Sequence, residues 1–414
     1  MKPKDFFFEK IPNILLILLP LSLITGPFIP DLSISIIAII FISRCFVEKN
    51  FSYFNNIYFK YFIVFYFICL LSALISDYKL ISSIKSFFYL RFGVFALAVW
   101  YLLSSNKNLI KYIFLSLMAC FLLLIFDGFI QYIYGKNIIG LPKHEIRLSS
   151  FFGQELILGS YVSRLLPILI GIFFLTNYSK KKINIFIFYI VIILSITLIY
   201  LTGERAAFLL TVMSITYITI MINRYSKNFI IISTVSFLII LIVNYNSPQI
   251  KGRMIDYTKD QLGLSNNTVD STNIYIGHFL IAEDLFKENV ILGVGPKNYV
   301  QHCNNNIKFQ SPPYVCTTHP HNTYLQLLAE TGLSGFFMIT VLFIIFSFFS
   351  AKHIYLKLIK KTDYFNFSEI CLMSSILITL WPFITSGSFF NNYLNIIYFF
   401  PIGILIWSRK INYL

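Results

Sequence analysis

The sequence predicts an all-α, polytopic integral membrane protein with about 12 transmembrane helices and one large loop. Of its 414 residues, 57% are hydrophobic and only 12% are charged, which is too apolar for a soluble domain of this size. Apolar runs long enough to cross a hydrocarbon core recur along most of the chain. These runs are continuous and do not alternate, which excludes an outer-membrane barrel.

The candidate spans follow one another from the start of the chain. In order they cover about 11–29, 32–47, 59–76, 87–104, 110–133, 156–176, 183–201, 206–222, 228–244, 333–350, 366–386 and 391–408. Lys2, Lys4 and Lys10 precede the first run, as in a signal peptide, but no small-x-small cleavage site follows it. We therefore expect the first run to be an uncleaved helix.

The formal net charge of +15 raises the question of a nucleic-acid partner. With twelve spans and the N-terminus inside, most lysines and arginines fall in the two termini and the short cytoplasmic loops. This is the positive-inside asymmetry of membrane proteins. We therefore expect contact with membrane lipids, both termini in the cytoplasm, and no nucleic acid.

The spans divide the chain into three parts. Residues 1–244 hold helices 1–9, residues 245–332 form the large loop on the outer face, and residues 333–414 hold helices 10–12. Tyrosines, phenylalanines and helical patterning predict an ordered, helical loop. Five of the six histidines fall in this loop or in the shorter outer segment 134–155: His144, His278, His302, His319 and His321.

Two cysteines, Cys303 and Cys316, share the large loop. An oxidising outer face favours a disulfide between them. A metal-binding pair is the alternative, but the spacing matches no common zinc pattern. We expect no metal site.

The stretch "TTHPHNTYLQLLAETGLSG" (317–335) carries the clearest polar chemistry. Tyr324, Leu327, Leu328 and Thr331 share one helical face, Asn322 suits the N-cap, and Gly332 suits the position after the helix. His321 would then lie at a helix N-terminus, which disfavours imidazolium and suits a general base. The alternative is a histidine that only caps or packs the loop.

Arginines within spans are functional candidates because their burial in a membrane is unfavourable. Arg91 and Arg164 lie in the fourth and sixth spans, Arg205 in the outer turn "LTGERAAF", and Arg147 in the outer segment before the sixth span. Four guanidinium groups could converge there and bind a diphosphate. The alternative is that some pair with Asp127 or Glu204, or extend toward the membrane surface. "GVGPKNY" (293–299) lacks the strand and the lysine-serine pair of a phosphate loop, so we expect a turn.

The quoted stretch resembles the O-antigen ligase family of bacterial membrane glycosyltransferases. From His321 it reads His-Asn, nine residues, Gly332, two residues, Gly335, as in that family. "LTGERAAF", "RLSSFFGQELILGSYV" and "FKENVILGVGPKNY" look like further family motifs. The resemblance covers roughly residues 140–340 by motif and the whole chain by topology.

The resemblance implies a GT-C-like fold in the bacterial inner membrane, with the active site facing the periplasm. It implies transfer of a glycan from undecaprenyl diphosphate to a hydroxyl of the lipid A core, with inversion and without a cofactor. His321 matches the catalytic histidine, and Arg205 matches a diphosphate-binding arginine. We expect Arg147, Arg164, Arg91, His319, Asn322 and Tyr275 to line the substrate site.

The sequence departs from the family at Tyr275, where ligases often have a second essential arginine. His278, Arg147 or Arg164 could take that role, or the protein could use a different acceptor. The nearest alternative functions are an O-antigen or exopolysaccharide polymerase and an enzyme that glycosylates protein side chains. A transporter of lipid-linked glycan is the alternative from another class, although the chain has no internal repeat.

Overall fold

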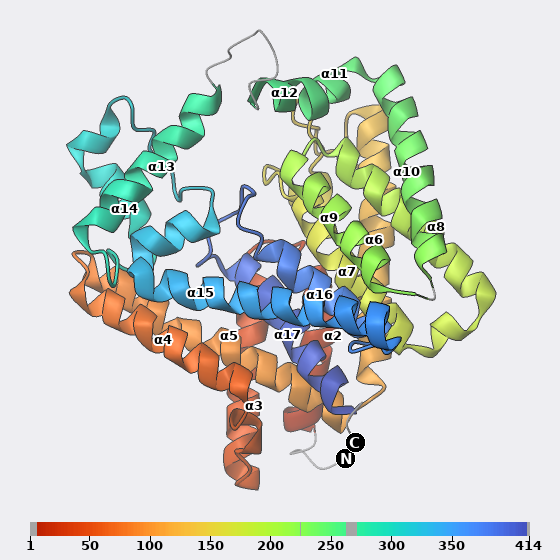
Figure 1. The fold of residues 1–414 in the computed structure, drawn as a ribbon, viewed down its shortest axis with the longest axis horizontal. Helices are drawn as coiled ribbons and strands as arrows, with labels where there is room; N and C mark the ends of the chain where they lie inside the picture. The colour runs from red at the N-terminus through yellow and green to blue at the C-terminus, as the bar shows by residue number, and fades with distance from the viewer. Residues whose placement is uncertain (1–5, 224, 262–270, 412–414) are drawn as a thin grey trace.

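A computed structural model describes residues 6–223, 225–261 and 271–411, and their regular structure is helical (Figure 1). Two isolated β-bridges, Lys136 with Pro142 and His144 with Arg147, are the exceptions in this part of the chain. The α-helices are α2 (Ile11–Ser22), α3 (Phe28–Glu48), α4 (Ile57–Ile75), α5 (Lys79–Ser105), α6 (Leu109–Tyr134), α7 (Leu158–Leu175), α8 (Lys182–Leu201), α9 (Arg205–Met221), α10 (Ser226–Asn246), α11 (Pro248–Lys251), α12 (Tyr257–Gln261), α13 (Ser271–Glu288), α14 (Tyr299–Asn305), α15 (Thr323–Tyr355), α16 (Phe367–Thr379) and α17 (Asn392–Ile411). The all-α prediction is confirmed.

Eight of the described helices are long and apolar enough to cross a membrane: α3, α4, α5, α6, α7, α8, α10 and α15. Two more apolar helices, α9 and α16, are shorter. Each of the twelve predicted runs overlaps a helix, but a count of twelve spans is not confirmed. The 13 residues of α16 reach only about 20 Å, less than the roughly 30 Å of a hydrocarbon core.

The eleventh predicted span, 366–386, is too long because its last third leaves the helix. α16 ends at Thr379, and residues 380–391 form a loop before α17. Pro382 and Gly387 lie in this loop, and proline and glycine are poorly suited to a helix interior. The loop is central to the candidate site, as described below.

α7 lies at the centre of the bundle, packed against α6, α8, α9 and α16. Its side chains from Tyr161 to Phe173 are all buried, as expected of a helix that is apolar around its whole circumference. α7 therefore carries Arg164 into the interior. α5, which is also largely buried, packs against α3, α4 and α17 on the other side of the fold (Figure 1).

The described part of the large loop is helical, as predicted. It holds α11, α12, α13 and α14, and α13 packs against α15. The α13–α14 region lies beside the ends of α4 and α5, whereas α11 and α12 follow α10 near α9 (Figure 1). α15 is broken at Gly332, whose φ of 60° and ψ of −163° are not helical. The break falls at the predicted boundary between the loop and the tenth span.

Candidate functional site

Asn322 is the N-cap of α15, as the sequence predicts. Its side-chain oxygen accepts hydrogen bonds from the backbone N–H groups of Tyr324 and Leu325, at 2.9 and 3.1 Å. These bonds satisfy two of the donors that a helix leaves open at its N-terminus. The amide nitrogen of Asn322 donates to the carbonyl oxygen of Pro382 at 2.8 Å. One side chain therefore begins the helix and ties it to the 380–391 loop.

His321 precedes this cap in an uncommon backbone conformation. Its φ is 54°, in the left-handed region that residues with a Cβ rarely adopt. The N–H of Ser386 donates to the carbonyl oxygen of His321 at 2.9 Å. The cap on one side and the 380–391 loop on the other thus hold the backbone of His321 in place, and strained backbone of this kind is typical of functional sites.

Three rings surround the His321 imidazole. The ring centroid of His319 lies 4.2 Å away, that of His278 5.4 Å away and that of Tyr275 6.1 Å away. Burial, and then the neighbouring His278, lowers the pKa of His321 below its ordinary value of 6.5. The predicted direction is therefore found, but its main cause is burial. Burial also lowers the pKa of His319, to about 4, so both rings are neutral near pH 7.

Three arginines meet beside this ring cluster: Arg147, Arg205 and Arg253. Arg253 donates from Nε to the carbonyl oxygen of Gly203 at 2.9 Å, and a Cβ at Gly203 would lie 3.5 Å from Cγ of Arg147. The positive charges of Arg205 and Arg253 act on Arg147, and Tyr275 acts on both Arg147 and Arg205. Tyr275 is therefore a neighbour both of these arginines and of His321. We name Arg147, Arg205 and Arg253 the arginine cluster.

Glu204 lies at the base of the arginine cluster. Its carboxylate accepts hydrogen bonds from the backbone N–H groups of Gly159 and Ser160 at the start of α7, at 2.7 and 3.0 Å. Burial raises the pKa of Glu204 to about 7, although these bonds and the charges of Arg147 and Arg164 oppose the shift. The carboxyl group therefore titrates near neutral pH.

The other two predicted arginines lie in different surroundings. Arg164 is buried in α7, where it donates to the hydroxyl of Ser160 and its charge acts on Glu204. Arg91 of α5 forms an ion pair with Asp31 of α3 at 2.6 Å, and its guanidinium lies over the ring of Phe92. Arg91 is thus engaged by a carboxylate in the first part of the chain, and the structure does not bring all four predicted arginines together.

Arg253 is the functional candidate that sequence reasoning missed. It lies in the short π-helical segment Gly252–Asp256 ("GRMID") after α11, and no motif distinguishes it. Its position follows from the path of the chain, because α8, α9 and α10 pack against one another. The α8–α9 turn and the segment that follows α10 therefore meet at the same end of these helices, which brings Arg253 to Gly203.

The "GVGPKNY" segment is a turn, as expected, and it braces the start of α15. The N–H groups of Val294 and Gly295 donate to the carbonyl oxygens of Ala329 and Glu330, at 2.9 and 3.0 Å. Gly293 has a φ of 69°, and a Cβ there would lie 2.5 Å from the backbone of Glu330. This close backbone approach requires glycine.

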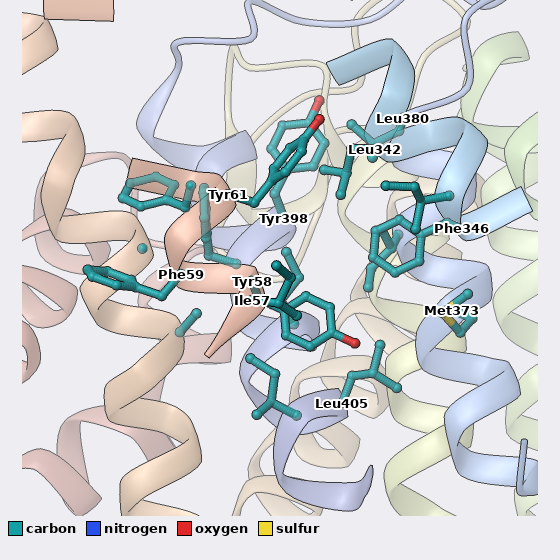
Figure 2. A pocket seen from close by; sticks show the side chains of 18 of the residues that line it. Ile57, Tyr58, Phe59, Tyr61, Leu342, Phe346, Met373, Leu380, Tyr398 and Leu405 are labelled. Carbon is teal, nitrogen blue, oxygen red and sulfur yellow. The ribbon is translucent and has the colours of Figure 1, made fainter. Parts of the chain in front are cut away.

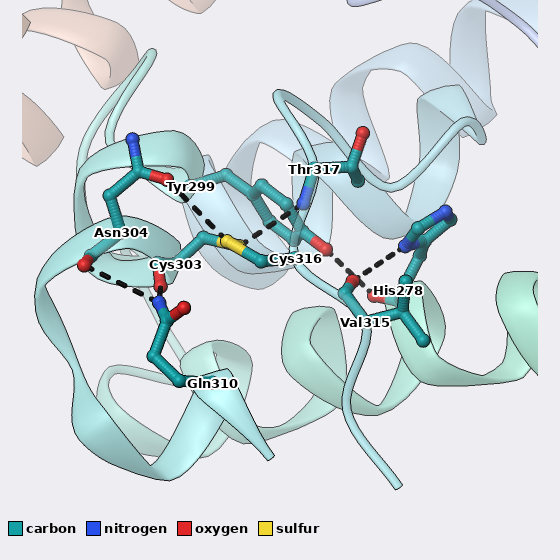
Figure 3. The surroundings of a disulfide bond; sticks show 8 residues. All are labelled: His278, Tyr299, Cys303, Asn304, Gln310, Val315, Cys316 and Thr317. Carbon is teal, nitrogen blue, oxygen red and sulfur yellow. Dashed lines mark hydrogen bonds between the residues drawn. A yellow bond between two sulfur atoms is a disulfide. The ribbon is translucent and has the colours of Figure 1, made fainter. Parts of the chain in front are cut away.

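Cys303 and Cys316 form a disulfide that joins α14 to the segment before His319 (Figure 3). The neighbouring carbonyl oxygen of Val315 lies 2.7 Å from Nδ1 of His278. Figure 3 shows the disulfide, Val315 and His278 side by side. Within the part of the chain that the structure describes, no group of three or more histidine, cysteine, aspartate or glutamate side chains is arranged to hold a metal ion.

An apolar cavity of about 760 Å³ lies between α4, α5, α15, α16 and α17 (Figure 2). Its lining includes Phe62, Phe346, Leu380, Phe389 and Tyr398. The carbonyl oxygen of Leu380, a residue that lines the cavity, accepts a hydrogen bond from the hydroxyl of Tyr324 in the first turn of α15, at 2.7 Å. This bond links the cavity wall to the segment that presents His321.

Residues 190–340 match the family model described as O-antigen ligase. This match supports the assignment of the chain to the O-antigen ligase family. The matched segment contains Arg205, Arg253, Tyr275, His278 and His321. No curated protein matches the chain. The family is glycosyltransferase-like and includes ligases and polymerases, and its substrates are lipid-linked glycans.

Proposed function

We propose that this protein transfers a glycan from undecaprenyl diphosphate to a hydroxyl group of the lipid A core. The observation that carries the proposal is that Tyr275 is a neighbour both of His321 and of Arg147 and Arg205 in the arginine cluster. The arginine cluster offers positive charge for a leaving diphosphate, and His321 offers a neutral base for the acceptor.

The arginine cluster would bind the donor diphosphate. Burial lowers the pKa of Arg147, and the nearby charges of Arg205 and Arg253 disfavour three cations in one place. A bound diphosphate would relieve this repulsion and accept bidentate hydrogen bonds from the guanidinium groups. The same groups would stabilise the negative charge that develops on the leaving phosphate. In this proposal Arg253 supplies the second arginine that the family pattern places at Tyr275.

The donor carries a long isoprenoid chain, and the protein offers apolar space for one. The apolar cavity is lined by apolar and aromatic side chains from five helices (Figure 2). Burial of an isoprenoid chain there would be favoured by the hydrophobic effect. The chain would then lie in the membrane while the diphosphate and glycan remain at the level of His321.

His321 would act on the acceptor. Its neutral imidazole would take the proton of the acceptor hydroxyl as that oxygen attacks the anomeric carbon from the side opposite the diphosphate. The new carbon–oxygen bond forms while the bond to the phosphate oxygen breaks, and the electron pair leaves with the diphosphate. The anomeric configuration would therefore invert. The site would face the periplasm of the inner membrane, with both termini in the cytoplasm.

A transfer assay tests the proposal. The purified protein is incubated with undecaprenyl-diphosphate-linked glycan and lipid A core, and the lipopolysaccharide is analysed by gel. A band of higher mass that requires the protein would support ligation. Lengthened lipid-linked glycan without this band would replace ligation by polymerisation. Absence of any transfer would contradict a glycosyltransferase and favour a transporter.

A further inference from the structure

His278 is buried in α13, and its contacts are unusually well defined. Nδ1 lies 2.7 Å from the carbonyl oxygen of Val315, a group that can only accept a hydrogen bond. Nδ1 must therefore carry a proton, and Nε2 is the ring nitrogen that can accept one. The hydroxyl of Tyr299 donates to the backbone carbonyl oxygen of His278 at 3.0 Å. Both the ring and the backbone of His278 are thus held.

A glycine allows the Val315 segment to reach His278. At Gly277 a Cβ would lie 2.7 Å from Cγ2 of Val315 and 2.9 Å from the carbonyl oxygen of Pro313. Only a residue without a side chain fits beneath this segment. The next residue, Cys316, is joined to Cys303 of α14, so the disulfide holds the segment from the other side (Figure 3).

The ring of His278 belongs to the ring cluster. Its centroid is 5.4 Å from that of His321 and 6.1 Å from that of Tyr275. His319, from the same segment, also lies beside His321, and its Nε2 lies 3.3 Å from the carbonyl oxygen of Ser386. The contact of His278 is shorter, and it ties the ring to the segment that the disulfide holds.

We propose that His278 is a positioning residue for His321, held in one tautomer by Val315, and that the two imidazoles handle the acceptor proton as a pair. This inference rests on the proposed function. The acceptor hydroxyl gives its proton to His321 as the glycosidic bond forms and the diphosphate departs. The proton then passes from His321 to Nε2 of His278 and on to water, which restores both neutral rings.

His278→Asn separates this role from a merely structural one. Asparagine keeps a donor near the position of Nδ1 for the Val315 carbonyl but removes Nε2. We expect kcat to fall about tenfold or more, within the range of general acid–base effects, with the donor KM unchanged. The pKa of His321, measured by NMR of labelled imidazole, should rise because the neighbouring imidazole no longer disfavours its protonation.

Two further variants sharpen the test. Gly277→Ala should also lower kcat and raise the pKa of His321, because its methyl group would displace Val315. Alanine itself favours helix formation, so α13 should remain intact. His302→Asn is the matched control: His302 is also a buried loop histidine, but it packs against Tyr78. We expect His302→Asn to leave kcat and the pKa of His321 unchanged.

The NMR readout needs no transfer, so it decides the inference even if the proposed function fails. A wild-type pKa of His321 in His278→Asn would overturn the pairing. A raised pKa of His321 together with a wild-type kcat would contradict transfer of the acceptor proton from His321 to His278. Wild-type protein that transfers no glycan would instead contradict the proposed function.

Discussion

The ring of Tyr275 lies 6.1 Å from that of His321, at 86° to it, and the same tyrosine acts electrostatically on Arg147 and Arg205. One side chain therefore connects the two halves of the candidate site. Arg253 comes from another segment of the large loop and donates to the carbonyl oxygen of Gly203. This guanidinium group was not among the arginines that the sequence predicts.

Arg253→Ala should weaken binding of the lipid-linked donor by about tenfold or more. Loss of one charge-assisted hydrogen bond contributes about 1.5–3 kcal/mol, and 1.4 kcal/mol is a factor of ten in affinity. Donor affinity can be measured by thermophoresis in detergent. Lys251→Ala is the control, because Lys251 is an exposed cation two residues away. Equal donor affinities in the two variants would show that Arg253 does not bind the donor.

The acid limb of the pH profile of kcat/KM should lie below pH 6.5. The base must be unprotonated, and burial together with His278 lowers the pKa of His321 from 6.5. At pH 6.5, where an exposed histidine is half protonated, more than half of the imidazole is therefore neutral. Transfer rates measured from pH 5 to 8 with subsaturating donor test this. An acid limb above pH 6.5 would speak against His321 as the base.

Glu204 should make the stability of the fold depend on pH. Its folded pKa of about 7 is above the ordinary value of 4.5, so the folded state binds the proton more tightly. This contribution to stability is complete below pH 4.5 and is lost as pH rises through about 7. Glu204→Gln cannot titrate. The Tm of wild type relative to this variant should fall between pH 5 and 8, and a constant difference would contradict the assignment.

Asn322→Ala and Asn322→Asp should separate helix capping from positioning of the loop. Alanine removes the cap and should cost about 1 kcal/mol in stability. Aspartate keeps the acceptor for Tyr324 and Leu325 but cannot donate to the Pro382 carbonyl. We expect near wild-type Tm but reduced transfer for Asn322→Asp. Full activity would show that the bond to Pro382 is dispensable.

The sequence could predict the local features of the site, because each depends on neighbouring residues. Asn322 caps α15 and Gly332 breaks it, as capping chemistry and glycine conformation indicate. The disulfide likewise follows from two cysteines in one outer loop. These features need no knowledge of tertiary contacts.

The missed features depend on segments that are distant in sequence. Arg91 pairs with Asp31, 60 positions away, and Arg253 reaches Gly203, 50 positions away. The 380–391 loop reads as part of an apolar span, although its backbone groups bond to His321 and Asn322. Hydropathy measures only how apolar a segment is. It does not indicate that the backbone groups of the segment form hydrogen bonds with residues at the start of another helix.

The most direct test of the account is the single-turnover rate of glycan transfer by His321→Ala with saturating donor and lipid A core. The account predicts that this variant binds the donor as wild type does, because the arginine cluster is intact, but transfers at least about a hundredfold more slowly. A wild-type transfer rate in a variant that binds the donor normally would contradict the assignment of His321 as the base.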